Sequence, residues 1–216
     1  MNNINFLESI KQKIGGPKSM ITMEHYDIIA IELLNCLLSN TEGDVVELGC
    51  NIGNTSLLLQ SCLNQFGSNK LLHIYDSFEG LPAKHLKDVS TNEDDRTKFI
   101  EGQLKVSVEN LINNFKQKQI NLPQIHTGWF KDIPEEEYPA KICFAFLDGD
   151  FYTSILDSLH RIYDKMSPGG VIIIHDYGWS PLPGIKLACE EFLKDKPENI
   201  LQDYCKNHIG KIIKQY

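Results

Sequence analysis

Residues 44–56 read DVVELGCNIGNTS, and this stretch decides the fold class of the chain. A strand pattern over residues 45–48 gives way here to a helical pattern over residues 53–66. Gly49 and Gly53 frame the turn between them, and glycine lets a backbone adopt positive φ and approach a ligand closely. The spacing differs from G-x-G-x-x-G, so the dinucleotide-binding fingerprint is not met. Taken alone, the turn fits a tight loop without a ligand equally well.

The same alternation of short apolar strands and helical segments continues along the chain. Further strands are predicted at residues 71–75, 124–129, 142–147, 171–174 and 209–213. Further helices are predicted at residues 24–38, 104–119, 152–165 and 184–194. Strands that alternate with helices build a mostly parallel sheet with helices on both faces, so we predict an α/β fold. Ligands of such sheets bind outside the carboxyl ends of the strands.

Composition and charge exclude several classes of protein. The 216 residues include 21 basic and 29 acidic ones, which gives a net charge of −8. This balance argues against sequence-independent binding of nucleic acid and against docking on anionic lipid. The longest apolar runs are too short to span a bilayer, and the first residues lack the apolar core of a signal peptide. We therefore expect a soluble cytoplasmic protein with no nucleic-acid or membrane partner.

The cysteines show no pattern of a metal or redox site. Six are present, at positions 36, 50, 62, 143, 189 and 205. No pair has C-x-x-C spacing, and most fall among apolar neighbours. We expect buried, reduced thiols.

An acidic residue closes the second strand. Residues 73–82 read HIYDSFEGLP, and Asp76 stands 27 positions after Gly49. A carboxylate at this place can accept hydrogen bonds from both ribose hydroxyls of an adenosine-containing cofactor. The alternative is an Asp that caps a turn. Together, the glycine turn and Asp76 indicate a nucleoside cofactor.

Two acidic residues follow the fourth strand. Residues 146–152 read FLDGDFY, which places Asp148 and Asp150 on either side of a glycine. One carboxylate can coordinate a cation while the other takes a proton. Asp150 also precedes a predicted helix and can serve as its N-cap, a role that does not exclude chemistry.

The fifth strand ends in a mixed pair of ligands. Residues 169–179 read GGVIIIHDYGW, and His175 and Asp176 follow the buried run. With Asp148 they form a set of oxygen and nitrogen ligands from neighbouring strands. Carboxylates suit Mg²⁺ or Mn²⁺, and imidazole shifts the preference toward Mn²⁺, Fe²⁺ or Zn²⁺. The alternative for His175 is a hydrogen-bonded structural side chain.

Other histidines and the two tryptophans carry weaker signals. No spacing signal marks His25, His73, His85, His126, His160 or His208. We expect structural or surface roles for these six histidines. Trp129 and Trp179 also follow strands, where they line a substrate crevice or simply pack.

From Ser19 to about Lys196 the chain resembles the macrocin and mycinamicin type of sugar O-methyltransferases, which use S-adenosylmethionine. The resemblance rests on the order and spacing of SMITMEHY, GDVVELGCNIGNTS, YDSFEGLP, HTGWFKDIP, FLDGDFYTSILDSLHRIYDKMSPGG and HDYG. It implies a Rossmann-like class I methyltransferase fold, with a seven-stranded, mostly parallel sheet whose last strand is antiparallel. It also implies a lid insertion at residues 78–103. We expect one domain over residues 1–216, in which residues 1–18 form an N-terminal arm that is either mobile or an interface element.

The resemblance assigns the cofactor-binding residues. In that family the first glycine turn wraps the methionine part of S-adenosylmethionine, and the acid after the second strand holds its ribose. The matching positions here are Glu47, Gly49, Cys50, Asn51 and Gly53 in the turn, and Asp76, Ser77 and Phe78 after the second strand.

The resemblance also assigns a metal and a base. The family's divalent ion, usually Mg²⁺, is held by the first Asp of D-G-D and by an Asp-Asp pair after the next strand. Asp148 and Asp176 match these positions, whereas His175 stands where the family usually has Asp, which brings Mn²⁺ into consideration beside Mg²⁺. Asp150 matches the position we assign to the general base, with Asp148 as its catalytic neighbour.

The predicted function is therefore S-adenosylmethionine-dependent O-methylation, assisted by a divalent cation, of a hydroxyl on a sugar or glycosylated metabolite. A catechol-type small-molecule O-methyltransferase is an alternative within enzymes, and a cofactor-binding module without catalysis is an alternative outside them. A nicotinamide-dependent dehydrogenase is disfavoured by the missing glycine fingerprint. The expected partner is a small-molecule or glycan substrate, and homo-oligomerisation is left open.

Overall fold

A computed structural model describes residues 3–16 and 21–215. Residues 1–2 and 17–18 of the predicted arm, and Ser19 and Met20 of the first motif, lie outside the described residues. The described residues form one mixed sheet in the order β3-β2-β1-β4-β5-β6. Its strands are β1 (Asp44–Leu48), β2 (Leu72–Asp76), β3 (Gln124–Thr127), β4 (Ile142–Leu147), β5 (Met166–Ile174) and β6 (Gly210–Ile213). Neighbouring strands are parallel except for β6, which pairs antiparallel with β5.

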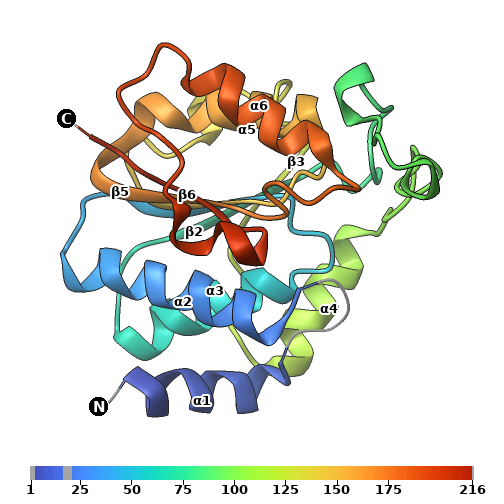
Figure 1. The fold of residues 1–216 in the computed structure, drawn as a ribbon. Helices are drawn as coiled ribbons and strands as arrows, with labels where there is room; N and C mark the ends of the chain where they lie inside the picture. Colours follow the sequence, from blue (N-terminus) through green and yellow to red (C-terminus); the bar gives the residue numbers. More distant parts are fainter. Residues whose placement is uncertain (1–2, 17–20, 216) are drawn as a thin grey trace.

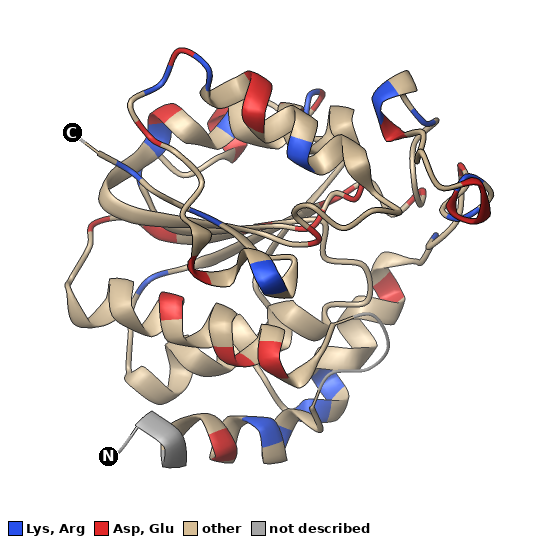
Figure 2. Ribbon diagram, viewed as in Figure 1, with Lys and Arg blue, Asp and Glu red and all other residues tan. Residues whose placement is uncertain are grey.

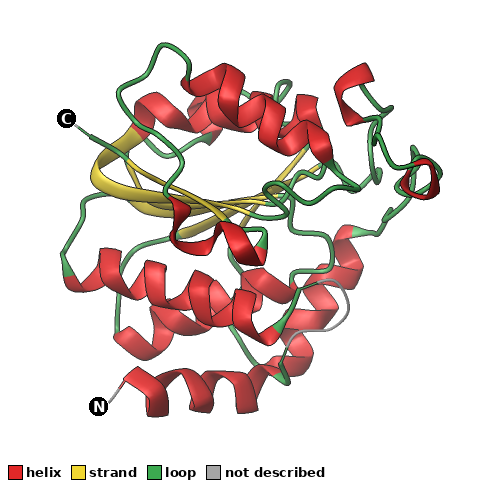
Figure 3. Cartoon of the chain, viewed as in Figure 1, coloured by secondary structure: helices red, strands yellow, loops and turns green. Residues whose placement is uncertain are grey.

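Helices cover both faces of the sheet, as the sequence predicts (Figure 1 and Figure 3). One face carries α1 (Asn3–Ile14), α2 (Met23–Leu38), α3 (Asn54–Phe66) and α4 (Val108–Lys118). The other face carries α5 (Tyr152–Ile162) and α6 (Pro183–Leu193). This three-layer arrangement follows from the βαβ alternation.

The central strand β4 explains why the strands read as continuous apolar runs. All six of its residues are buried. Phe144 and Phe146 pack toward α2 and α3, whereas Ala145 and Leu147 pack toward α5 and α6. A parallel strand covered on both faces needs apolar side chains at every position, so its sequence shows no alternation.

The predicted seven strands are corrected to six in the described part of the chain. The last strand, β6, is antiparallel as expected. Beside it, Leu201 makes only an isolated antiparallel bridge to Lys211. A 3₁₀ helix, Gln202–Asn207, begins at the next residue and ends the pairing before a further strand forms.

Two other segments differ from the predicted boundaries. β5 begins at Met166 and not at residue 171, because Met166 already pairs with Ile142 of β4. The next pair is Val171 with Phe144, so the residues between Met166 and Val171 form a bulge in β5. In the predicted N-terminal arm, residues 3–14 form α1. Its side chains at positions 6, 7, 10 and 14 are buried in the core that α2 and α3 also share. Their spacing is that of one helix face.

Two further expectations concern cysteines and membranes. The six cysteines are unpaired, and all but Cys205 are buried, which confirms the predicted environment. Among the described helices, none combines the length and the apolar character that crossing a bilayer requires.

The carboxyl ends of β1, β2, β4 and β5 meet at one edge of the sheet. Figure 2 shows acidic residues gathered at the strand ends on this edge. The segment between β2 and α4, which contains two short 3₁₀ turns at Leu86–Asp88 and Glu93–Asp95, also lies at this edge. Ligands of doubly wound sheets bind at such an edge, so a functional site is expected there.

Candidate active site

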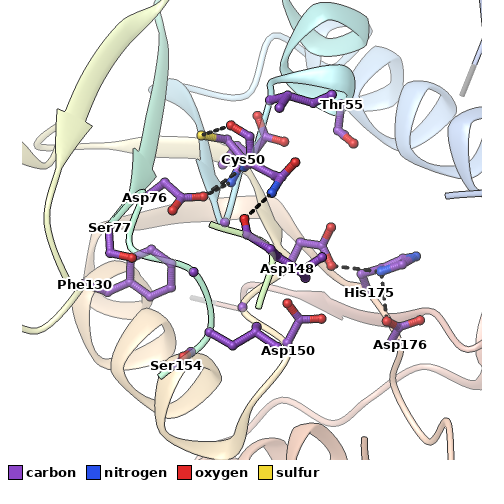
Figure 4. Close-up of a pocket in the computed structure, with 18 of the residues that line it drawn as sticks. Cys50, Thr55, Asp76, Ser77, Phe130, Asp148, Asp150, Ser154, His175 and Asp176 are labelled. Atoms are coloured by element: carbon purple, nitrogen blue, oxygen red, sulfur yellow. Dashed lines mark hydrogen bonds and ion pairs between the residues drawn. The ribbon is translucent and has the colours of Figure 1, made fainter. Parts of the chain in front are cut away.

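A pocket opens at this edge, and it collects most of the predicted site residues (Figure 4). The predicted residues that line it are Glu47, Gly49, Cys50, Asn51, Asp76, Ser77, Asp148, Asp150, His175 and Asp176. Gly53 and Phe78 lie outside its lining. Gly53 instead is the N-cap residue of α3, and the buried Phe78 donates its backbone N–H to Asp76.

The glycine turn after β1 is needed for close packing of two loops. Gly49 has a φ of 91°, and a Cβ at this residue would lie 2.2 Å from the carbonyl oxygen of Asp148. Its N–H donates to the carbonyl oxygen of Tyr75 at 2.8 Å. Only a residue without a side chain lets the end of β1 pass so close to the loop after β4.

Asp76 holds the glycine turn in place. Its Oδ2 accepts hydrogen bonds from the backbone N–H groups of Cys50 and Asn51 at 3.0 and 2.9 Å. Its Oδ1 accepts from the N–H of Phe78 at 2.8 Å. A carboxylate has about four acceptor positions, so about one is left on Oδ1 for a ligand hydroxyl. The turn-capping role that the sequence left open is therefore present, and the remaining acceptor faces the pocket.

Glu47 lines the pocket and carries a buried carboxyl oxygen without a hydrogen-bond partner in the described part of the chain. Ser56 donates its hydroxyl to Oε2, but Oε1 has no hydrogen-bond partner among the described residues. Burial raises the pKa of Glu47 to about 8; the Ser56 hydrogen bond opposes this, and the nearby carboxylates of Asp148 and Asp76 add to it. A buried carboxylate without a partner is costly, so this oxygen fits a cationic ligand group such as an ammonium.

The raised pKa of Glu47 predicts a pH dependence of stability. The folded protein binds this proton more tightly than the unfolded chain, whose ordinary pKa is 4.5. The contribution is therefore fully present below 4.5 and is lost as the pH rises through about 8. In ligand-free wild-type protein, the melting temperature is expected to fall as the pH rises from 4.5 to about 8. In Glu47→Gln it is expected to fall less over the same pH range.

Thermal unfolding at a series of pH values measures this effect. The control is Glu101→Gln, which changes an exposed side chain and should leave the wild-type slope. If the Glu47→Gln profile is as steep as the wild-type profile, the carboxyl does not titrate as described.

Asp150 is a free carboxyl inside the pocket. Its backbone is left-handed, with a φ of 61°, and its side chain makes no hydrogen bond within the described part of the chain. Burial and the neighbouring carboxylates of Asp148 and Asp176 raise its pKa well above the ordinary value. A carboxyl with a raised pKa is a stronger base once it ionises, which suits proton abstraction.

Asp150 does not cap the helix that follows it, so this alternative is wrong. The N-cap of α5 is Phe151. The first turn of α5 is capped by Asp88 instead, whose Oδ1 accepts from the N–H of Tyr152 at 2.7 Å. Asp88 lies in the long segment after β2, which the sequence could not place beside α5.

Three side chains at the ends of β4 and β5 converge as a ligand set. Atoms of Asp148, His175 and Asp176 that can bind a metal lie within 4.8 Å of one another. Nδ1 of His175 is 2.9 Å from Oδ1 of Asp148 and 3.3 Å from Oδ2 of Asp176 (Figure 4). Burial lowers the pKa of His175, but the two carboxylates outweigh burial and raise it well above its ordinary value. Two carboxylates and an imidazole at this spacing are ligand types that a divalent ion accepts, so the donor set fits such an ion.

Several lining residues carried no predicted role. Among them are Ile21, Tyr26, Thr55, Phe130 and Ser154. All five lie inside the quoted motifs, so the motifs marked their segments but not their side chains. Trp129 lines this pocket, whereas Trp179 packs edge-on against Phe99 and lines a second hollow formed by residues 97–103.

Comparison with known proteins gives relatives and solved structures of similar sequence or fold. The chain is 29% identical to 8-demethyl-8-(2,3-dimethoxy-α-L-rhamnosyl)-tetracenomycin-C 4′-O-methyltransferase of Streptomyces olivaceus; the alignment covers 74% of this chain and 62% of that protein. It is 26% identical to mycinamicin III 3″-O-methyltransferase of Micromonospora griseorubida, over 81% of this chain and 69% of that protein. The structure of the O-methyltransferase NovP superimposes with a TM-score of 0.79 at 23% identity, over 99% of both chains, which shows a shared class I methyltransferase fold.

The family match covers most of the chain. Residues 17–204 match the family described as macrocin O-methyltransferase (TylF). This match includes the glycine turn, Asp76, the D-G-D residues and the pair after β5, which form the pocket. The resemblance predicted from the sequence is confirmed, and the chain belongs to the macrocin O-methyltransferase family.

Proposed function

We propose that this protein is an S-adenosylmethionine-dependent O-methyltransferase that acts on a hydroxyl of a sugar or glycosylated small molecule. The observation that carries the proposal is one pocket that is lined both by the glycine turn with Asp76 and by the carboxyl of Asp150, which makes no hydrogen bond among the described residues. S-adenosylmethionine, when bound, supplies a methyl group made electrophilic by a sulfonium. The family and the two relatives, both O-methyltransferases and one of them named for a rhamnosyl substrate, support this chemistry.

One side of the pocket is suited to the cofactor. The unpartnered Oε1 of Glu47 is placed to accept from the α-ammonium of the methionine part. The left-handed turn at Gly49 keeps that part against the backbone. The remaining acceptor of Asp76 Oδ1 is suited to a ribose hydroxyl.

The other side of the pocket is suited to the acceptor. A sugar hydroxyl is a poor nucleophile at neutral pH, so its proton has to leave as its oxygen takes the methyl group. Asp150 is the group that accepts this proton, because its carboxyl is uncommitted and faces the cavity. A positioned base contributes roughly 10²–10⁴-fold, and orientation of the reactants adds up to about 7–11 kcal/mol.

A divalent cation is the second part of the proposal. Asp148, His175 and Asp176 would hold it, since their ligand atoms already converge. When bound, it would lower the pKa of a coordinated hydroxyl and serve as a template for the acceptor. The imidazole favours Mn²⁺ over the Mg²⁺ that carboxylates alone would favour.

We propose that residues 78–103 act as the lid over the acceptor. The N–H of Leu81 donates to the carbonyl oxygen of Gln103 and the N–H of Gly102 donates to that of Leu81, which closes the neck of this segment. Asp88 anchors its body on α5, as described above. Gly184 of α6 leaves room for that anchor, because a Cβ there would lie 1.8 Å from Oδ1 of Asp88.

Ligand-induced stabilisation tests the cofactor assignment. S-adenosylhomocysteine at about 100 times its Kd is expected to stabilise the fold by roughly 2.7 kcal/mol. For a chain of this size, that corresponds to an increase in the melting temperature of about 5–10 °C. NAD⁺ at the same concentration is the control and should leave the melting temperature unchanged.

The absence of a shift with S-adenosylhomocysteine would reject the methyltransferase proposal. A shift without methyl transfer to any acceptor would favour a cofactor-binding module. Methyl transfer is measured with a panel of acceptors that contains nucleotide sugars, glycosides and catechols. Turnover with catechols alone would favour the catechol-type alternative.

A further inference from the structure

Both ring nitrogens of His175 are engaged by other side chains. Nδ1 faces Asp148 and Asp176, as described above. Nε2 lies 3.0 Å from Nδ1 of His25, a residue 150 positions earlier in the chain. Both histidine side chains are buried, with 3% and 9% of their surface exposed. His25 therefore forms the inner wall behind the proposed cation ligands.

His25 is itself held firmly. It stands in the first turn of α2, where its backbone N–H donates to the hydroxyl of the N-cap residue Thr22 at 3.2 Å. Its Nε2 lies 2.9 Å from the carbonyl oxygen of Asn207. The two imidazole rings meet edge to face, with centroids 4.9 Å apart and an interplanar angle of 79°. These contacts fix both the position and the rotation of the ring.

The direction of the hydrogen bonds follows from the last acceptor. The carbonyl oxygen of Asn207 can only accept, so Nε2 of His25 donates. An imidazole that donates from Nε2 offers Nδ1 as its acceptor, and Nδ1 of His25 is the atom that faces His175. Nε2 of His175 must then be the donor to His25. Nδ1 is then the only ring nitrogen of His175 that can bind a cation, and it lies beside the carboxylates of Asp148 and Asp176.

We propose that His25 is a positioning residue that occupies Nε2 of His175, aims Nδ1 at Asp148 and Asp176, and thereby makes the site prefer Mn²⁺ over Mg²⁺. A second hydrogen bond that fixes the tautomer and orientation of a ligating imidazole also strengthens its binding to a metal. Mn²⁺ accepts a nitrogen ligand more readily than Mg²⁺ does, so the gain falls mainly on Mn²⁺. The inference rests on the proposed function only in taking these three residues as the cation ligands.

Calorimetric titration of the chelator-treated full chain with Mn²⁺ and with Mg²⁺ tests the proposal. Wild-type protein is expected to bind Mn²⁺ more tightly than Mg²⁺. His25→Phe keeps a ring but no hydrogen bond, and it should weaken Mn²⁺ binding by about 10–100-fold with a smaller change for Mg²⁺.

Two companion variants separate positioning from packing. His25→Gln should retain most of the Mn²⁺ affinity, because its amide can accept from His175 and donate to the Asn207 carbonyl. His160→Phe changes an exposed histidine on α5 and should match the wild type. Equal affinities of wild-type protein for the two ions, or unchanged Mn²⁺ binding in His25→Phe, would overturn the proposal.

A measurement on wild-type protein covers the case in which His25→Phe does not fold. This measurement is NMR of ¹⁵N-histidine-labelled protein with Zn²⁺ as the probe ion. Nε2 of His175 should carry a proton with and without Zn²⁺, and Zn²⁺ should shift the Nδ1 resonance. A Zn²⁺-induced loss of the Nε2 proton would contradict the inference. Binding of S-adenosylhomocysteine, measured on the same samples, reports separately on the proposed function.

Discussion

Asp150→Asn is expected to lower methyl transfer by about 10²–10⁴-fold while S-adenosylhomocysteine binds as in the wild type. The amide has the same shape as the carboxyl but cannot take the proton of the acceptor hydroxyl. Cofactor affinity should persist, because the residues suited to the cofactor, Glu47 and Asp76, make no hydrogen bond to Asp150 and are unchanged in this variant. Turnover is measured with the best acceptor of the panel, and affinity by calorimetric titration.

Asp164→Asn is the control for this variant, since it changes an exposed carboxyl after α5. It should leave both turnover and affinity unchanged. Retention of full activity in Asp150→Asn would show that another group accepts the proton. Loss of S-adenosylhomocysteine binding in the same variant would show instead that Asp150 supports the cofactor side.

The position of the site could be predicted from the sequence because it depends on local signals. Each strand is a short apolar run, and the polar residues that matter follow these runs directly. Asp76, Asp148 and His175 could therefore be assigned to one edge before their contacts were known. The βα turn was equally local, since Gly49 and Gly53 mark it within five residues.

Contacts between segments far apart in the sequence could not be predicted. The cap of α5 comes from Asp88 in the long segment after β2, so the local signal at Asp150 pointed to the wrong residue. His25 carries no spacing pattern, yet it meets His175 across 150 positions. Both contacts depend on tertiary packing, which propensity and periodicity do not report. Helix α1 differs from them, because its buried positions 6, 7, 10 and 14 have the spacing of one helix face and its local signal is present in the sequence.

The local geometry of Gly49 leads to the second large prediction. Gly49→Ala is expected to lower the free energy of unfolding by about 2–5 kcal/mol and the melting temperature by roughly 4–20 °C. About 1–2 kcal/mol arises from left-handed backbone in a residue with a side chain. The rest, about 1–3 kcal/mol, arises because the methyl group meets the carbonyl oxygen of Asp148 at 2.2 Å.

Gly67→Ala separates these two causes. Gly67 also has a left-handed φ, of 74°, but no described atom lies within 4 Å of a Cβ placed there. It should therefore show only the backbone cost, about 1–2 kcal/mol, with unchanged affinity for S-adenosylhomocysteine. Gly49→Ala should in addition lose at least about tenfold in that affinity, because relief of the clash moves the turn away from Asp76. Equal destabilisation by the two variants would mean that the loop after β4 yields freely. The close approach of β1 to that loop would then not be what shapes the pocket.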